Sequence, residues 1–393
     1  MKVNKLFNRN LSRMRIITID NQKLILISLE KKLSEIGYNV KTARTAEEGI
    51  ELINSFNPDL VTVDINMPEM SAIDVLKYIK ESSIETKVIV MSGKTDEDII
   101  LELFEYGIDD YIRKPATLSE VVARVNKQIG MCTISDNFKT ENSTSIIKEK
   151  CIGVVIPCYN EEDRLLSEEF SNFVRKNLGY HLCFVNDGST DNTLEILNTL
   201  SIGRESHISV FNCTKNRGKA EAVRQGVLYL TNTSDLDLDY IGFLDADLST
   251  SLKDFDDLVE TLNTHSYKII SGSRIERIGA DITKQSTRQF ISIMVNYAIQ
   301  RILGMKFKDT QCGAKVMHKD VVPILFNDQF ITRWLFDVEM FIRLKKYYGD
   351  KTKTMIYEQP LKRWIHADGS KLSMKDSLKI GGQLLRIATY YNK

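Results

Sequence analysis

Residues 240–262 read YIGFLDADLSTSLKDFDDLVETL: an apolar run, two aspartates and then a helical stretch. The apolar part is typical of a buried strand that leads into a helix. In an extended strand, residues two apart point to the same side, so Asp245 and Asp247 are expected to converge on one point. Mg²⁺ or Mn²⁺, which prefer oxygen ligands, would remove their mutual repulsion. The alternative is an acidic turn before a helix whose N-cap is Ser249, Thr250 or Ser251.

The same order of strand and helix recurs along the chain. A short apolar run after Arg15 ends at Asp20, and a helical pattern then ends at Gly37, its expected C-cap. Further strand endings are DLVTVD, KVIVMS and DDYIRKP in the first part of the chain, and CIGVVIP, HLCFVND, HISVFNC and KIISGS in the second. The alternation predicts an α/β protein with doubly wound sheets.

Between the two runs of strands lies a polar segment rich in Ser, Thr, Asn and Lys, which predicts a linker at 131–150. We therefore expect two doubly wound domains, at 13–130 and 151–393. A length of 393 residues is enough for each to bury a core of its own.

The charge balance excludes one broad class of function. The chain has 53 Lys and Arg against 53 Asp and Glu, so it lacks the basic excess of a nucleic-acid-binding protein, and no nucleic-acid partner is expected. The six cysteines form no C-x-x-C pair, which favours reduced thiols. No export signal and no apolar run long enough to span a membrane are present, so we expect a cytoplasmic protein.

The strand ends of the first domain carry a set of groups suited to phosphoryl chemistry. In open α/β sheets, ligands bind beyond the carboxyl ends of the strands. The residues at those ends are Asp20, Asp64, Ser92 and Lys114. The acids can bind a divalent metal, Lys114 can pair with a phosphate on one of them, and Ser92 can hydrogen-bond to it.

With their neighbours VTVDINMPEM, VIVMSGKTD and YGIDDYIRKP, these residues resemble the receiver domain of two-component response regulators over about residues 13–130. The resemblance implies a flavodoxin-like fold and a phosphodonor, a histidine kinase or another. It implies that Asp64 is the phosphoacceptor and a metal ligand, that Asp20 and Asn66 complete the metal site, and that the switch residues are Ser92, Tyr111 and Lys114. The family usually has a second acid after the first strand, where this chain has Asn21; a receiver that only docks is the alternative.

The strand ends of the second domain suit a nucleoside diphosphate. They carry Asp187 before Gly188, the Asp245 and Asp247 pair, and Arg274. A diphosphate needs a metal, the ribose or base hydroxyls need an acceptor, and loops with little side-chain bulk let the backbone approach. Asp187 suits the hydroxyls, and Asp245 and Asp247 suit the metal.

In order, IPCYNEE, VNDGSTD, NRGKAEA, DADLST and GSR resemble an inverting family 2 glycosyltransferase with the GT-A fold, over about residues 151–385. KDTQCGAKVM (308–317), TRWLFDVEMFIRL (332–344) and RWIHADGSKL (363–372) resemble polyprenyl-phosphate sugar transferases, most closely the dolichyl-phosphate β-glucosyltransferases. Ser249 replaces a third metal-contacting side chain of the related mannosyltransferases, so the identity of the metal stays open. The implied nucleotide-sugar-binding residues are Pro157, Tyr159, Glu161, Asp187, Asn216, Lys219 and Asp245.

The resemblance also implies a mechanism. A lipid phosphate is already anionic near neutral pH, so no strong base is needed, and the metal on Asp245 and Asp247 would stabilise the departing diphosphate. The expected catalytic residues are Asp337, Asp247 and Arg274. Asp337, the first choice for any base, has an acidic helix start as its alternative. The expected acceptor-binding residues are Arg288, Asp309, Gln311, Glu339 and Lys371.

A lipid acceptor implies membrane contact without a membrane span. The segment RQFISIMVNYAIQRILGMKFK (288–308) has a broad apolar helical face next to basic residues, which favours a helix lying at the inner face of the cell membrane. The alternative is a helix pair that packs on the sheet.

The function we expect is a receiver-regulated inverting transfer of a hexose from a nucleotide sugar, of the UDP-glucose or GDP-mannose type, to a polyprenyl phosphate, with Mg²⁺ or Mn²⁺ in both domains. Two alternatives remain: a glycosyltransferase with a soluble or polysaccharide acceptor, and a signalling adaptor without catalysis. The sequence leaves open the donor, the direction of regulation, the kinase and whether the protein is a homodimer.

Overall fold

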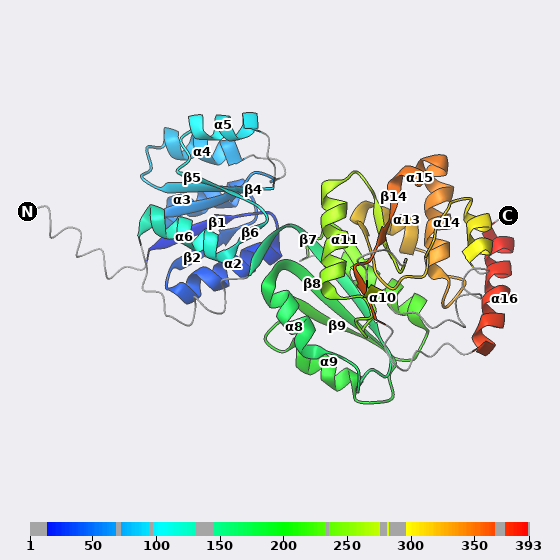
Figure 1. Cartoon of the computed structure of the whole chain (residues 1–393). Coiled ribbons are helices and arrows are strands. Elements are labelled where there is room, and N and C mark those ends of the chain that lie inside the picture. The colour runs from blue at the N-terminus through cyan, green and yellow to red at the C-terminus, as the bar shows by residue number, and fades with distance from the viewer. Residues whose placement is uncertain are drawn as a thin grey trace, which may run out of the picture. The chain divides into compact units, whose positions relative to one another are not determined.

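The computed structural model in Figure 1 describes residues 14–67, 72–93, 97–130, 145–232, 236–275, 281–282, 296–365 and 374–391. The chain forms two compact units. The first contains the residues up to Cys151 together with 174–180 and 235–237, and the second contains the remainder. Each unit has its own sheet with helices around it, as the sequence predicts.

The sheet of the first unit has the strand order β2-β1-β3-β4-β5, the flavodoxin-like order expected from the receiver resemblance. All its strand pairs are parallel, so each connection must cross over, and the helices supply these crossovers. The strands are β1 (Arg15–Ile19), β2 (Asn39–Ala43), β3 (Leu60–Asp64), β4 (Lys87–Ser92) and β5 (Asp110–Arg113). The helices are α2 (Lys23–Ile36), α3 (Ala46–Phe56), α4 (Ala72–Glu81), α5 (Glu97–Glu105) and α6 (Leu118–Ile129).

One face of this sheet packs against α3, α4 and α5. Val61 and Val90 of the sheet, both without solvent exposure, belong to the same buried cluster as Val75 of α4 and Leu103 of α5. Burial of each such side chain contributes about 1.5–3 kcal/mol. Gly37 ends α2 with φ 109° and a backbone N–H that donates to Leu33 and Ser34, so the predicted C-cap is confirmed.

The sheet of the second unit has the order β14-β11-β13-β10-β7-β8-β9. It is mixed, because β13 runs antiparallel to both of its neighbours. The strands are β7 (Ile146–Cys158), β8 (Asn177–Asp187), β9 (Ile208–Cys213), β10 (Tyr240–Phe243), β11 (Ile269–Ser273), β13 (Lys315–His318) and β14 (Ile356–Pro360). The short strands β12 (Asp281–Ile282) and β15 (Arg363–Trp364) pair with each other.

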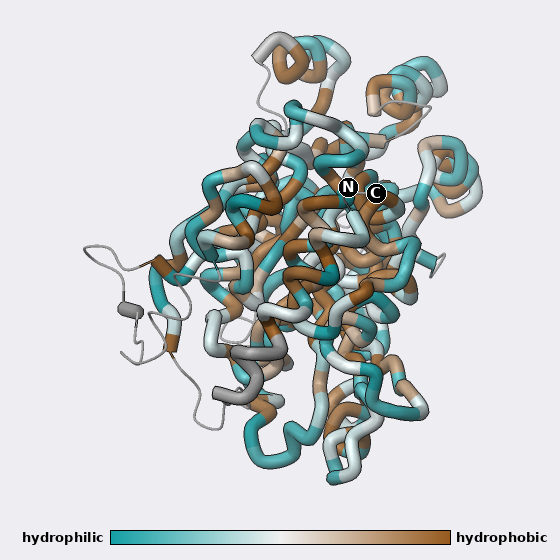
Figure 2. Tube along the Cα trace, turned by 90° about the vertical axis from the view of Figure 1, so that its right-hand side faces the viewer, coloured by the Kyte–Doolittle hydropathy of each residue, from teal (hydrophilic) through white to brown (hydrophobic). Residues whose placement is uncertain are grey.

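The helices of the second unit are α8 (Ser167–Lys176), α9 (Thr193–Ser201), α10 (Lys219–Asn232), α11 (Leu252–Thr264), α13 (Val322–Phe326), α14 (Phe336–Tyr348), α15 (Thr352–Met355) and α16 (Met374–Tyr391). Short 3₁₀ turns cover Lys319–Val321 and Gly349–Lys351. Figure 2 shows apolar and polar residues alternating along the helices, as expected where each helix buries one face.

The end of the predicted linker is a strand. Residues 146–150 belong to β7, and Ile146 and Ile147 pair with β6 (Ala116–Thr117). Ile147 is fully buried, so tertiary pairing overrides the polar composition that indicated a linker. Residues 131–144 lie outside the described part of the chain.

The segment predicted to lie on a membrane is described only from residue 296. Residues 296–303 are helical, with Ile299 and Leu303 buried and Tyr297 60% exposed. Met305 and Phe307 are buried after this helix, and Phe307 stacks on Phe341. The described part therefore packs one face against the protein core and turns Tyr297 outward. In the described residues, no helix combines the length and apolarity needed to cross a membrane.

Candidate functional site

The predicted phosphoryl site of the first unit is brought together at the carboxyl edge of its sheet. Lys114 Nζ lies 2.7 Å from Asp20 Oδ2 and 3.2 Å from Asp64 Oδ2, and all three side chains are buried. Burial raises the pKa of Asp20, a rise that the Lys114 ammonium opposes without cancelling it. Burial alone would lower the pKa of Lys114, but the two carboxylates raise it above its usual value.

The donor set of this site fits a divalent cation. Two buried carboxylates share one ammonium, which leaves an excess negative charge in a place where an uncompensated charge is costly. Mg²⁺ is commonly held by one or two carboxylates, and backbone, water and phosphoryl oxygens supply its other ligands. The backbone N–H of Asn66 donates to Asp64 Oδ1 at 3.3 Å, so this predicted metal-site residue lies beside the predicted phosphoacceptor.

The predicted switch residues meet each other. Ser92, at the end of β4, is fully buried, and its side chain is hydrogen-bonded to that of Tyr111 on β5. Burial raises the pKa of the Tyr111 hydroxyl, and the hydrogen bond to Ser92 opposes this rise. A movement of the Ser92 side chain would therefore break or shift its hydrogen bond to Tyr111.

In the second unit, two predicted donor-site loops are tied together by side chain to backbone hydrogen bonds. Asn160 accepts from the Thr190 backbone at 2.9 Å, and its own N–H donates to Ser189 Oγ at 3.0 Å. The N–H of Glu161 donates to Thr193 Oγ1 at 2.8 Å. The Glu161 carboxylate is paired with Arg164 at 2.7 Å, so it helps to hold the loop. Pro157 lies near the end of β7, and Tyr159 is the first residue after that strand.

Asp187 joins these loops to the segment that carries Asn216 and Lys219. Its two carboxylate oxygens accept from the backbone of Arg217 at 2.9 Å and Gly218 at 2.8 Å. Burial raises the pKa of Asp187, and these two hydrogen bonds oppose the rise. Gly188 has φ 65°, and a Cβ there would lie 2.5 Å from the Asn216 nitrogen, so only glycine fits this turn.

The acidic pair Asp245 and Asp247 lies in a turn. β10 ends at Phe243, and the Leu248 N–H donates to the Asp245 carbonyl at 3.3 Å with Leu248 at φ 50°. The extended-strand geometry expected for Asp245 and Asp247 is therefore wrong. The alternative, a turn before a capped helix, is confirmed, because Ser251 Oγ accepts from Asp254 as the N-cap of α11.

Both acids of this turn lie within electrostatic reach of the Lys219 ammonium group. Asp245 is ion-paired with Lys219, the first residue of α10, and a Cβ on Gly313 would lie 2.0 Å from Asp245 Oδ2. Burial alone would lower the pKa of Lys219, but Asp245, Asp337 and Asp247 raise it. Among the described residues, no group of three or more His, Cys, Asp or Glu side chains surrounds a metal-sized space. Two carboxylates, those of Asp245 and Asp247, are enough for Mg²⁺, because substrate phosphates and waters commonly supply its remaining ligands.

Asp337 has a partner that the sequence analysis missed. It lies at the start of α14, and its Oδ1 is 2.6 Å from Nζ of Lys315. The Lys315 side chain is fully buried, and its ammonium also donates to the Cys312 carbonyl at 2.7 Å. Burial raises the pKa of Asp337, against the opposing effect of the Lys315 and Lys219 ammonium groups. The available signal was a lysine at the start of an apolar strand, in CGAKVM.

Arg274 and Asp309, which the sequence analysis assigns to separate roles, form an ion pair. Asp309 accepts from Arg274 Nε at 2.7 Å and from Nη2 at 2.8 Å, a two-point pair, and also from the Arg274 backbone at 2.9 Å. Burial alone would raise the pKa of Asp309, but Arg274 lowers it to about 2. The guanidinium also lies 5.4 Å from the Trp364 ring centre. Asp309 therefore orients Arg274, and the Gln311 N–H donates to the same carboxylate at 3.2 Å.

Glu339 is expected to bind the acceptor, and in the structure its carboxylate binds a loop of the protein itself. It is fully buried, and its carboxylate accepts from the backbone of Ile331 and Thr332, from Thr332 Oγ1 and from the Tyr391 hydroxyl. These contacts fix the loop that carries Arg333, whose carbonyl accepts from Ala220 at 3.3 Å. The structure shows the Glu339 carboxylate engaged by this loop, and its direct contact with the acceptor stays a prediction. Arg288 and Lys371 lie outside the described residues.

Known proteins resemble this chain in two stretches. The family model for the response regulator receiver domain matches residues 16–126, and that for glycosyl transferase family 2 matches residues 153–325. Two similar relatives are dolichyl-phosphate β-glucosyltransferases: one from Drosophila melanogaster is 31% identical over 61% of this chain and 75% of its own length, and one from Trichomonas vaginalis is 29% identical over 61% and 73%. The cell cycle transcriptional regulator CtrA of Caulobacter vibrioides is 34% identical over 29% of this chain and 49% of its own length. The chain therefore belongs to glycosyl transferase family 2, in the group of the dolichyl-phosphate β-glucosyltransferases, and it carries a response regulator receiver domain.

Proposed function

We propose that the second unit transfers a hexose, with inversion, from a nucleotide sugar to a polyprenyl phosphate, and that the receiver unit regulates this transfer. The observation that carries the proposal is a chain of alternating charges, Lys315, Asp337, Lys219 and Asp245, at the carboxyl edge of the second sheet. Such a chain places both acids beside ammonium groups, at the edge of the sheet where a donor diphosphate would enter.

The donor end is built for a nucleoside diphosphate sugar. Asp187 holds the loop of Arg217 and Gly218 so that backbone can approach a ligand closely. Asp245 and Asp247 would hold Mg²⁺ or Mn²⁺, which when bound supplies positive charge for the departing diphosphate. Lys219, at the N-terminus of α10, adds a second cation beside Asp245. The relatives are named as glucosyltransferases, which favours a glucosyl donor such as UDP-glucose over a GDP-mannose type donor.

The chemical step needs little from a base. A phosphate oxygen of the acceptor attacks the anomeric carbon, the bond from that carbon to the diphosphate oxygen breaks, and the nucleoside diphosphate leaves with the electron pair. Attack on the opposite face turns an α-linked donor into a β product. Asp337 holds its place through Lys315, and its role is to orient a sugar hydroxyl by accepting a hydrogen bond.

Arg274 is our candidate for the contact with a phosphate. Two of the five N–H groups of the Arg274 guanidinium donate to Asp309, which fixes the plane of the guanidinium. An arginine held in this way is well oriented to donate to phosphate oxygens. A polyprenyl phosphate as acceptor is supported by the names of the relatives. Membrane contact through the surface of Tyr297 and Arg301 follows from the same acceptor, and binding to anionic vesicles would test it.

The receiver proposal rests on the contacts of Asp64. A phosphoryl group there would add negative charge beside Lys114 and a strong acceptor near Ser92, whose side chain is bonded to Tyr111. If the phosphoryl group accepted the hydrogen bond of the Ser92 hydroxyl, Ser92 would no longer bind Tyr111. Tyr111 could then move and alter the surface of the first unit. Transfer rates measured before and after phosphorylation, with Asp64→Ala as the reference, test this proposal; equal rates would reject it.

The transfer itself is tested by following a labelled sugar into an organic-soluble product in the presence of a polyprenyl phosphate. Asp245→Asn should remove the product, whereas Asp350→Asn, a change at a highly exposed acid in the same unit, should leave it unchanged. Label in a water-soluble product only would favour a soluble acceptor. A folded protein that gives no product with any donor would favour the adaptor alternative.

A further inference from the structure

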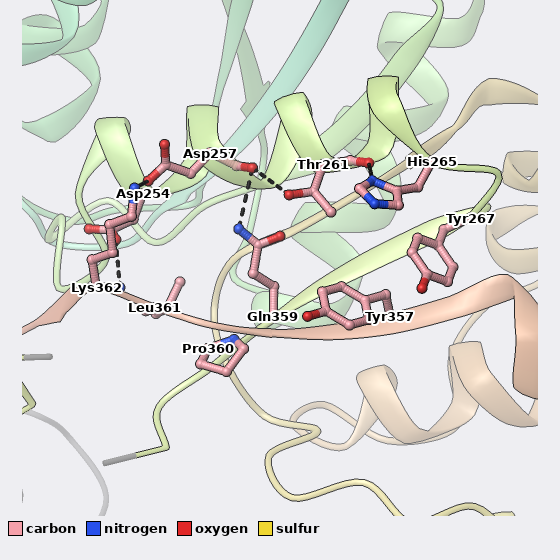
Figure 3. Close-up of a pocket in the computed structure, with 10 residues that line it drawn as sticks. All are labelled: Asp254, Asp257, Thr261, His265, Tyr267, Tyr357, Gln359, Pro360, Leu361 and Lys362. Carbon is pink, nitrogen blue, oxygen red and sulfur yellow. Dashed lines mark hydrogen bonds and ion pairs between the residues drawn. The ribbon is translucent and has the colours of Figure 1, made fainter. Parts of the chain in front are cut away.

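A cavity of about 370 Å³ lies between α11 and β14, apart from the residues of the donor site. Figure 3 shows its lining side chains, which come from α11, from the segment before β11, and from β14 and the residues just after it. Its volume lies in the lower part of the range of small-molecule sites, about 300–1,000 Å³. The space is large enough for a single six-membered ring with its substituents.

One end of the cavity is aromatic. The rings of Tyr267 and Tyr357 are stacked, with centroids 5.1 Å apart and planes at 16°. His265 stacks on Tyr267 in turn, at 5.7 Å and 22°. Tyr357 is 39% exposed, so this stack is accessible from solvent. Stacked rings hold each other rigid, which lets them present a flat apolar surface at a small entropic cost.

The middle of the cavity offers hydrogen-bond acceptors. Gln359 Nε2 donates to the Asp257 carbonyl at 3.3 Å, while its Oε1 is buried and has no partner among the described residues. In Figure 3 this oxygen points away from Asp257, toward the aromatic end. A buried amide oxygen without a partner is unfavourable, so a ligand that donates a hydrogen bond to it would be favoured. The Thr261 hydroxyl donates to the Asp257 carbonyl at 3.0 Å, which leaves its oxygen able to accept.

The charges of the cavity disfavour an anion. Asp254 and Asp257 contribute two carboxylates, and the one cation among the lining residues, Lys362, is paired with Asp257 at 2.7 Å. A phosphate or a nucleotide would meet net negative charge here. Asp254 already accepts from the Lys362 backbone at 2.9 Å and from the Ser251 hydroxyl at 2.6 Å, so its carboxylate supports the wall of the cavity.

We propose that this cavity binds an uncharged carbohydrate, one hexose unit, at a site separate from that for the nucleotide sugar. The C–H face of a pyranose ring matches the Tyr267 and Tyr357 stack, and its hydroxyls donate to Gln359 Oε1 and to Asp257. An uncharged sugar packs its C–H face on an aromatic ring and donates hydrogen bonds from its hydroxyls, and this cavity has both an aromatic face and hydrogen-bond acceptors.

The test is ligand-detected NMR on the full-length protein with glucose, mannose and maltose as neutral probes and glucose 6-phosphate as the anionic one. We expect saturation transfer to a neutral sugar, and weaker binding of its phosphate. Tyr357→Ala and Gln359→Leu should each weaken binding about tenfold, the loss of one stacking or hydrogen-bond contact. Tyr347→Ala, at a tyrosine 67% exposed on α14, is the matched control.

Asp245→Asn separates this proposal from the proposed transfer, because it removes the donor site and leaves the cavity intact. Binding that persists in Asp245→Asn and is lost in Gln359→Leu supports the cavity site, whether or not transfer is observed. Binding unchanged by both cavity variants, no binding of any neutral probe, or tighter binding of the phosphate would each overturn it. Unfolding midpoints of the variants verify that they are folded.

Discussion

The buried pair of Lys315 and Asp337 gives the sharpest test of how the second unit is held together. The two charged atoms are 2.6 Å apart, and the side chains are 0% and 7% exposed. Lys315→Met keeps most of the volume of the side chain and removes its charge. The Asp337 carboxylate is then left buried, with Lys219 as the remaining nearby cation.

Removing one partner of a buried ion pair costs about 3–5 kcal/mol, and because Lys219 still compensates part of the charge we expect the lower end, about 3 kcal/mol at neutral pH. The loss should depend on pH. Burial already raises the pKa of Asp337, and without Lys315 the pKa rises further. A carboxyl with a raised folded-state pKa adds stability below its unfolded pKa, and this contribution disappears as pH rises through the folded value. The deficit of Lys315→Met should therefore be smallest in acid and largest near neutrality.

The assay is urea unfolding followed by tryptophan fluorescence. The two tryptophans of the chain, Trp334 and Trp364, both lie in the second unit, so the signal reports on that unit alone. Lys268→Met, which breaks the exposed pair with Asp320, is the matched control and should cost about 0–1 kcal/mol.

Adding Asp337→Asn to Lys315→Met removes the stranded charge and should restore most of the lost stability. If Lys315→Met costs no more than Lys268→Met, or if the second substitution restores nothing, the pair does not have the role assigned to it.

Three further outcomes follow from single sites. Asp64→Ala should abolish labelling of the protein by acetyl phosphate; undiminished labelling would place the phosphoacceptor elsewhere. Asp309 has a pKa of about 2, below its usual value, so its contribution to stability is complete above the usual pKa and is lost as pH falls; the difference in urea midpoint between wild type and Asp309→Asn should close between about pH 4 and pH 2. Gly188→Ala should lose about 1–3 kcal/mol and weaken donor binding, because its Cβ would meet the Asn216 backbone, whereas Gly203→Ala, with a similar positive φ and open space, tests the backbone strain alone.

The sequence predicted the residues at the strand ends well, for a physical reason. In a parallel sheet, the carboxyl ends of all strands share one edge, so Asp20, Asp64 and Lys114 meet although they are far apart in the chain. The same rule predicted the positions of Asp187 and Arg274. Gly37 was predicted as a cap because its conformation is local.

Features set by tertiary contacts were not predictable in this way. Lys315 lies on a strand antiparallel to its neighbours, and nothing local indicates that its charge is buried against Asp337. The turn after Phe243 depends on a positive φ at Leu248, which leucine rarely adopts. Glu339 resembled a site residue by its spacing from Asp337, but its burial against the loop of Thr332 is decided by the packing of α16 through Tyr391.

The central claim, a metal-assisted transfer to a polyprenyl phosphate, is tested most directly by nucleoside diphosphate release. The protein is incubated with a panel of nucleotide sugars and Mg²⁺ or Mn²⁺, with and without a short polyprenyl phosphate, and wild type is compared with Asp245→Asn. We expect rapid release from one donor that requires the lipid phosphate, the metal and Asp245 together. Release that is independent of the lipid or unchanged in Asp245→Asn, or no release from any donor by the folded protein with Asp64 phosphorylated or not, would contradict it.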